Sequence, residues 1–121
     1  MNIIVTRPEH DVTTRYLSAW AEEIIVFARK KGNVVIDLFR EKANRTELEG
    51  RVKKIAPDVV FLNGHGSDTS ITGHDNKVLI DANINHSVLA GMITYALSCD
   101  AGKVLGERVV QSSYGFFLEG A

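Results

Sequence analysis

The chain has 121 residues, which at ~100 to 200 residues per domain predicts one domain with one hydrophobic core. Fourteen Lys and Arg residues against fifteen Asp and Glu residues give a formal net charge of -1. This balance removes the simplest argument for a nucleic-acid or anionic-membrane partner. The single cysteine, Cys99, cannot form an internal disulfide. With no signal-peptide pattern and no apolar stretch of membrane-spanning length, the sequence predicts a cytoplasmic protein.

The first third of the chain predicts a strand, a helix and a second strand. Ile3–Val5 is a short apolar, β-branched run, as in a buried strand. From Asp11 onward the apolar spacing changes to intervals of three and four, which predicts an amphipathic helix ending at Gly32. Asn33–Leu38 is the second predicted strand. The helix face expected to meet the core carries Leu17, Trp20, Ile24 and Phe27.

The next segment repeats the helix and strand. Asn44 is a helix-capping residue with Glu47 three positions later, and Pro57 stops the helical pattern. Asp58–Leu62 has an all-apolar centre, which indicates a strand buried on both faces.

The second half of the chain predicts a hairpin followed by further strands and helices. The alternation of strands and helices predicts an α/β fold, with a doubly wound, mostly parallel sheet of about five strands, helices on both faces and a hairpin insertion. The predicted elements are a hairpin over Ile71–Asp81, a short helix over Asn85–Ala90, a strand over Ile93–Ser98, a helix over Gly102–Gln111 and a strand over Tyr114–Leu118.

Two of the predicted strands end next to residues that can take part in a reaction. Sites in parallel α/β sheets form outside the carboxyl ends of the strands. The third strand runs into a loop with His65, and the fourth runs into Cys99. If these strands are neighbours, a base and a nucleophile leave the same sheet edge on strands ~5 Å apart.

A cysteine nucleophile needs a base or a positively charged neighbour, because only a few per cent of an ordinary cysteine is thiolate at neutral pH. His65 can act as the base. Cys99 stands just before a predicted helix, whose N-terminal amides favour an anion. The glycines on both sides of His65 allow close approach of the backbone, so the amides of Gly66 and Cys99 could bind a developing oxyanion.

Structural explanations stay open beside the catalytic one. A lone cysteine at the end of an apolar strand is more often a small buried hydrophobe, and a histidine in a glycine-flanked loop more often serves a turn. A metal site built from side chains after the third strand matches no familiar ligand spacing, and no metal is expected. The residues considered for it are His65, Asp68, His74 and Asp75.

Two segments resemble the caspase-like cysteine peptidases, a group that includes CHAT domains, caspases, metacaspases, gingipains and separase. The segments are Val60–Ser67, with its His-Gly pair, and Ile93–Gly102, which carries the cysteine. The resemblance implies hydrolysis of peptide bonds through a thioacyl-enzyme. It implies Cys99 as nucleophile, His65 as general acid and base, and the amides of Gly66 and Cys99 as the oxyanion hole. It implies no metal or organic cofactor.

The resemblance leaves the residue preference of the peptidase open. Metacaspases that cut after Arg or Lys carry an aspartate two residues before the nucleophile, where this chain has Leu97. The caspase pattern Gln-Ala-Cys-Arg-Gly is not reproduced either. Arg7, after the first strand, is the predicted substrate-binding residue, because it could face an acidic or carbonyl group.

The family also suggests partners beyond a peptide or protein substrate. Its peptidases usually continue past the strand represented here by Tyr114–Leu118, so we expect a dimer or a second chain to complete the pocket. The alternative prediction is a catalytically silent caspase-like module that acts in protein-protein interaction.

Overall fold

The predicted α/β architecture is confirmed by the computed structural model, which describes residues 1–112 and 115–120. Within these residues five parallel strands form one sheet in the order β2-β1-β3-β6-β7, and β4 pairs with β5 in a separate antiparallel ribbon. The strands are β1 Asn2–Arg7, β2 Val34–Phe39, β3 Val59–Asn63, β4 Ser70–Thr72, β5 Val78–Asp81, β6 Ile93–Leu97 and β7 Phe116–Gly120. The helices are α1 Val12–Lys30, α2 Arg45–Ile55 and α3 Glu107–Ser112, with short 3-10 turns η1 Arg40–Lys42, η2 His74–Asn76 and η3 His86–Leu89 and a π-helical turn η4 Gly102–Gly106.

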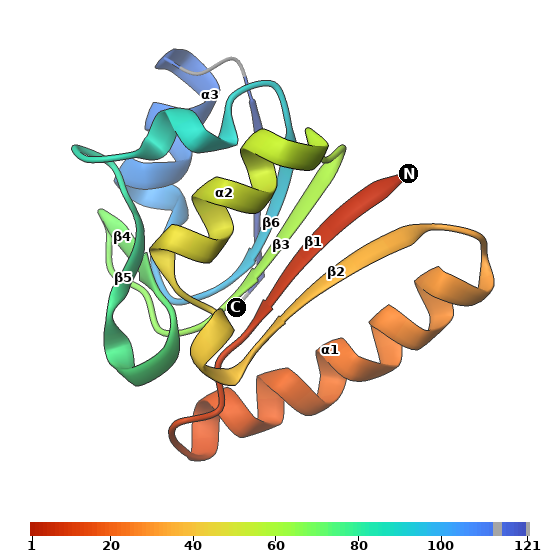
Figure 1. Cartoon of the computed structure of the whole chain (residues 1–121). Helices are drawn as coiled ribbons and strands as arrows, with labels where there is room; N and C mark the ends of the chain where they lie inside the picture. The colour runs from red at the N-terminus through yellow and green to blue at the C-terminus, as the bar shows by residue number, and fades with distance from the viewer. Residues whose placement is uncertain (113–114, 121) are drawn as a thin grey trace.

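The two faces of the sheet are covered unequally. Figure 1 shows α1 alone on one face, with α2, α3 and the β4–β5 ribbon on the other. The main core lies on the second face, because side chains of these elements bury the apolar strand residues there. Its fully buried members include Ile4, Leu48, Val60, Leu62, Leu89, Leu105 and Val109.

The face that α1 turns to the sheet differs from the prediction. The residues it buries are mostly small: Thr14, Ser18, Ala21 and Ile25. They let the helix approach β1 and β2 closely over a thin cluster with Val5 and Val35. The predicted core stripe is wrong, since Trp20 is 64% exposed and Phe27 62% exposed.

The later elements follow the prediction with shifted ends. The hairpin forms as β4 and β5, and the short helix is the 3-10 turn η3. The predicted helix over Gly102–Gln111 begins as the π-helical turn η4 and continues as α3. The start of the last predicted strand, Tyr114, lies outside the described residues, and β7 runs over Phe116–Gly120. None of the helices described is long and apolar enough to cross a membrane.

We predict that two neighbouring residues of α1 differ sharply in their effect on stability. Ile25→Ala removes a side chain only 3% exposed and should lower the free energy of unfolding by about 2 kcal/mol or more. Val26→Ala changes a side chain that is 51% exposed and should cost less than about 0.5 kcal/mol. Chemical denaturation monitored by circular dichroism measures both. Equal losses would contradict the orientation of α1 described above.

Candidate active site

His65 and Cys99 leave neighbouring strands at the same edge of the sheet. β3 and β6 are adjacent and parallel, and their last registered pair is Asn63 with Leu97. His65 and Cys99 each lie two positions after the last residue of their strand. The predicted juxtaposition of the two loops is therefore present. Within the described part of the chain, however, no hydrogen bond joins the two side chains, and Cys99 is exposed.

Gly66 makes the contact between these two loops. A Cβ atom on Gly66 would overlap the hydroxyl of Ser98 and would lie 2.7 Å from the carbonyl oxygen of Cys99. Only glycine fits this close approach of two backbones. Gly66 also forms an isolated antiparallel bridge with Ile71. The bonds of this bridge come from the flanking residues, so the amide of Gly66 points away from Ile71.

Asp11 joins the site from the loop after β1. Its Oδ2 lies 2.6 Å from Nε2 of His65. β1 is the neighbour of β3 on the side opposite β6, so the loops after β1 and β3 emerge together. Asp11 is also the N-cap of α1, where its Oδ1 accepts hydrogen bonds from the amide of Thr14 at 2.9 Å and the hydroxyl of Thr14 at 2.8 Å.

These contacts keep Asp11 negatively charged. The backbone amide of Thr14 is the main cause of a strongly lowered pKa of the Asp11 carboxyl, and the hydrogen bond with His65 adds to it. A histidine that faces a fixed carboxylate through one ring nitrogen keeps the other available for proton exchange. Asp11 therefore supplies an orienting partner for the imidazole of His65. The sequence pattern alone does not mark Asp11 as a site residue, because an aspartate before a helix is an ordinary cap.

Two more histidines surround this pair. His10 has a side chain only 9% exposed, and its Nε2 lies 3.1 Å from Oδ1 of Asn76. The ring centroid of His10 is 6.0 Å from that of His65 and 5.5 Å from that of His74. The loop after β1 thus packs against both the His65 loop and the turn η2.

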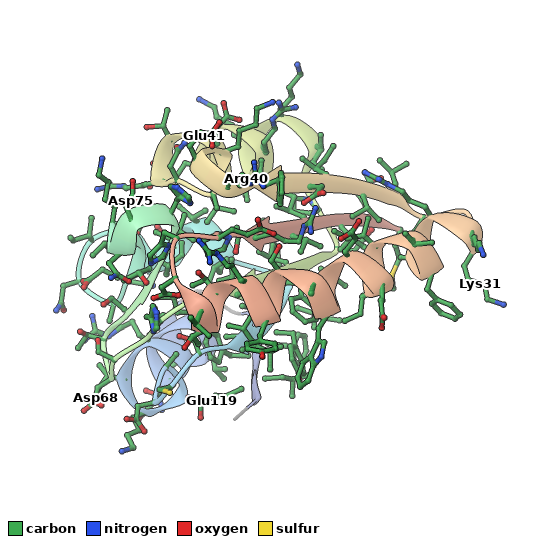
Figure 2. The ribbon with its side chains drawn as sticks, turned by 90° about the horizontal axis from the view of Figure 1, so that it is seen from below. Lys31, Arg40, Glu41, Asp68, Asp75 and Glu119 are labelled. Atoms are coloured by element: carbon green, nitrogen blue, oxygen red, sulfur yellow. The ribbon has the colours of Figure 1, made fainter. Side chains whose placement is uncertain are left out.

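The metal-ligand set considered from the sequence is not brought together. Asp68 lies on another side of the edge, where its carbonyl oxygen accepts the amides of Val104 and Leu105. Figure 2 shows Asp68 well away from Asp75. Among the described residues, the group whose donor atoms all lie within 4.8 Å of one another is His10, Asp11 and His65.

The turn after Cys99 differs from the regular helix start expected there. Asp100 has a left-handed backbone, with φ of 59°, and the π-helical turn starts only at Gly102. The amide of Gly102 donates to Oε1 of Glu119 at 2.9 Å. That amide is occupied by a carboxylate of β7, so it is not available to a Cys99 thiolate.

Arg7 is buried and fully engaged within the protein. Its Nε and Nη2 donate to the two carboxylate oxygens of Asp37 at 2.9 and 2.7 Å, and Nη1 donates to the carbonyl and hydroxyl oxygens of Ser18. The hydrogen bond with Asp37 raises the pKa of Arg7. These contacts tie β1 to β2 and α1. Binding of substrate by Arg7 stays a prediction, and it would require exchange of these partners.

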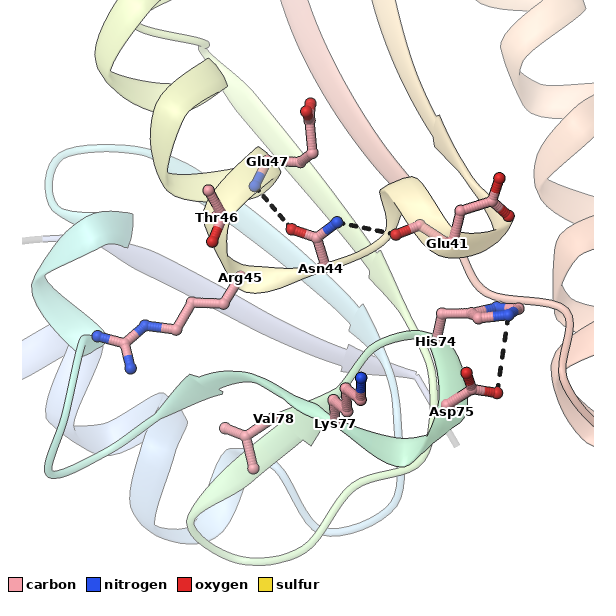
Figure 3. Close-up of a pocket in the computed structure, with 9 residues that line it drawn as sticks. All are labelled: Glu41, Asn44, Arg45, Thr46, Glu47, His74, Asp75, Lys77 and Val78. Carbon is pink, nitrogen blue, oxygen red and sulfur yellow. Dashed lines mark hydrogen bonds and ion pairs between the residues drawn. The ribbon is translucent and has the colours of Figure 1, made fainter.

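A polar pocket lies beside the histidine cluster, on the side of His74. Figure 3 shows it between η1, the start of α2 and the turn η2. Its groups mostly bind one another: Asn44 accepts from the amide of Glu47 and donates to the carbonyl of Glu41, while Arg45 pairs with Glu49 outside the pocket. The pocket is therefore a hollow next to the candidate site, joined to it by the contact of His74 with His10.

No protein-family model, curated protein or solved structure matches this chain. The chemistry available at the sheet edge is a thiol, an imidazole oriented by a carboxylate, and a glycine backbone in contact with the thiol's own residue.

We predict that two substitutions separate what Asp11 contributes to stability as a helix cap from what it contributes as a negative charge. Asp11→Asn keeps an oxygen for the Thr14 amide but loses the charge beside His65, so it should cost ~0.5 kcal/mol of stability. Asp11→Ala loses both and should cost about 1 kcal/mol or more.

The pH dependence of the free energy of unfolding should identify the contribution of the Asp11 charge. Because the pKa of Asp11 is lowered on folding, its contribution is present above the ordinary value of ~3.9 and is lost as pH falls through the lowered one. Chemical unfolding should therefore show a gap between the native protein and Asp11→Asn that is constant above about pH 5 and narrows in stronger acid. A gap that widens on acidification would contradict this assignment.

Proposed function

We propose that the protein is a caspase-like cysteine endopeptidase in which Cys99 is the nucleophile and His65 the general acid and base. The observation that carries the proposal is the contact of Gly66 with the Cys99 backbone, which brings together the loops that hold these two residues. The pairing of His65 with Asp11 supports it, since an oriented base is the third part of an activated nucleophile. The fold class agrees with the resemblance found in the sequence.

The proposed reaction has two halves. His65 takes the proton from Sγ of Cys99, and the thiolate attacks the carbonyl carbon of the peptide. The amides of Gly66 and Cys99 stabilise the oxyanion. His65 then protonates the leaving amine as the carbon–nitrogen bond breaks, which leaves a thioester on Cys99. In the second half His65 deprotonates a water molecule that attacks the thioester, the carbon–sulfur bond breaks, and the proton returns to sulfur.

Asp11 acts in this scheme as a positioning residue. Its carboxylate stabilises the imidazolium that forms transiently on His65. The side chain of His65 is 39% exposed and Cys99 is exposed, so both have room to turn toward each other when a substrate binds. The mechanism needs a reduced thiol, in keeping with the proposed cytoplasmic location, and uses no metal or organic cofactor.

The first test measures the reactivity of Cys99 without assuming a substrate. Alkylation by a small haloacetamide, followed by intact mass, should be about tenfold or more faster at neutral pH in the native protein than in His65→Ala. Asp11→Asn should give an intermediate rate because it leaves the imidazole in place. His86→Ala serves as a matched control for loss of a histidine outside the site. A rate that does not depend on His65 would overturn the coupling.

The second test measures turnover directly. The native protein should cleave members of a peptide library, and Cys99→Ala should abolish cleavage while keeping its circular dichroism spectrum. Hydrolysis that survives in Cys99→Ala would exclude Cys99 as the nucleophile.

A second candidate function, a catalytically silent interaction module, is favoured by an uncovered part of the sheet. Phe61 of β3 packs against the α1 cluster, and it is registered with Tyr95 of β6, which is registered with Leu118 of β7. The side chains of one register row share a face, so β6 and β7 turn apolar side chains to the α1 side. There α1 does not reach them: Leu118 is 56% and Phe116 68% exposed.

The exposed stripe of α1 borders this uncovered half of the sheet. The opposite flank of the helix faces β2, because Arg29 donates to the carbonyl of Val35 and Glu22 pairs with Arg7. The stripe is therefore turned toward β6 and β7. We call the combined surface the apolar face; it comprises Trp20, Ile24 and Phe27 of α1 with Ile93, Tyr95, Phe116 and Leu118 of the sheet.

We propose a second copy of the chain as the occupant of the apolar face. The exposed parts of its side chains amount to roughly 700 Å², close to the ~800 Å² that each partner buries in a standard interface. A helix stripe beside a bare sheet is self-complementary under a two-fold axis, with the helix of each copy lying on the sheet of the other. The net charge of -1 opposes such pairing only weakly.

Sedimentation equilibrium tests this pairing. The native protein should be dimeric, and Trp20→Glu and Leu118→Glu should each shift it to monomer, because a charge would be buried in the interface. Ile84→Glu is the matched control: Ile84 is 61% exposed outside the apolar face, and its substitution should leave the dimer intact. A native protein that is monomeric at the highest soluble concentration would reject a second copy as the occupant.

A further inference from the structure

We propose that His10, Asp11 and His65 form a binding site for a divalent transition-metal ion of the Zn²⁺ class. This inference goes beyond the proposed peptidase function and does not depend on it, because it concerns binding by three side chains and requires no reaction at Cys99.

The donor atoms converge from two separate segments of the chain. Oδ2 of Asp11 lies 2.6 Å from Nε2 of His65 and 3.7 Å from Nε2 of His10. The candidate donor atoms of the three residues all lie within 4.8 Å of one another. Ligands of a tetrahedral ion with bonds of about 2.1 Å stand roughly 3.4 Å apart. The three groups therefore need only small side-chain rotations to share one ion.

His10 is the least explained residue of the cluster. Its side chain is only 9% exposed, yet its Nδ1 is buried without a hydrogen-bond partner. Its other ring nitrogen, Nε2, is the one that lies 3.7 Å from Oδ2 of Asp11, and it also lies 3.1 Å from Oδ1 of Asn76. A buried imidazole with so few protein partners is costly unless something else binds to it. A metal ion bound to Nε2 would replace the Asn76 contact as the partner of this ring.

The surroundings resemble the support that metal ligands usually have. Oδ1 of Asp11 is held by the amide and hydroxyl of Thr14, which leaves Oδ2 for the ion. His65 and Asp11 are 39% and 38% exposed, so an ion can enter from solvent.

The donor set selects the class of ion. Imidazole nitrogen favours Zn²⁺, Cu²⁺, Ni²⁺ and Fe²⁺, whereas Mg²⁺ and Ca²⁺ favour sites made of oxygen alone. Two histidines and one carboxylate leave a fourth position open to water. If the peptidase proposal also holds, metal and catalysis compete, because an imidazole that binds an ion through Nε2 carries its proton on Nδ1 and cannot accept one from Cys99.

Cobalt(II) is a suitable probe because its visible spectrum reports the ligands. The native protein should bind one equivalent of Co²⁺ with d–d absorption bands, and Zn²⁺ should displace it. His10→Ala, Asp11→Asn and His65→Ala should each weaken binding by about tenfold or more. Asp11→Asn keeps the helix cap, and circular dichroism of each metal-free variant establishes that it is folded.

Two control variants exclude other sites. Cys99→Ser should bind Co²⁺ as the native protein does, and the native spectrum should lack a thiolate-to-metal charge-transfer band. His86→Gln, which removes a histidine outside the cluster, should also leave affinity unchanged. Binding that is lost in Cys99→Ser, or unchanged in His10→Ala, would overturn the site. Since no substrate or turnover enters the measurement, failure of the peptidase proposal would leave this result standing.

Discussion

The parallel register of β1, β3 and β6 is the constraint on which the candidate site depends. Parallel strands place all their carboxyl ends at one edge, so three loops far apart in sequence meet there: the first with His10 and Asp11, the second with His65, the third with Cys99. Gly66 then allows the second and third loops to touch through their backbones. The main core beneath the sheet fixes this register, because a slip of one residue would turn Val60 and Leu62 out of it.

The sequence predicted the strands and the His65–Cys99 edge well because the signals are local. An apolar β-branched run that ends in polar residues shows both the strand and its exit. The orientation of α1 was not predictable in this way. Its strongest apolar stripe contains Trp20 and Phe27, but small residues such as Ser18 and Ala21 allow the closest approach to β1 and β2. The periodicity of the sequence predicts an apolar stripe on a helix. Whether the rest of the protein covers that stripe depends on the tertiary arrangement.

The site residues that the sequence pattern does not reveal have ordinary local roles. Asp11 reads as a helix cap, which it is, and its second oxygen becomes important only when β1 pairs with β3. His10 has no motif partner near it in sequence. Arg7 shows the opposite case: an arginine after a strand suggested a substrate contact, whereas its guanidinium is satisfied by Asp37 and Ser18. The local sequence predicts which polar residues lie at a sheet edge. Their hydrogen-bond partners are set by neighbouring strands that are distant in sequence.

The Asp11 carboxylate gives the site two mutually exclusive uses. With a proton available on His65, the pair is an oriented acid–base group beside a thiol. With a transition-metal ion present, the same carboxylate and imidazole become ligands and His10 completes the set. Both uses draw on the anchoring of Asp11 by Thr14, which holds the carboxylate in place and ionised. The position of His65 between Asp11 on one side and the Cys99 loop on the other makes it the residue through which metal occupancy would act on thiol chemistry.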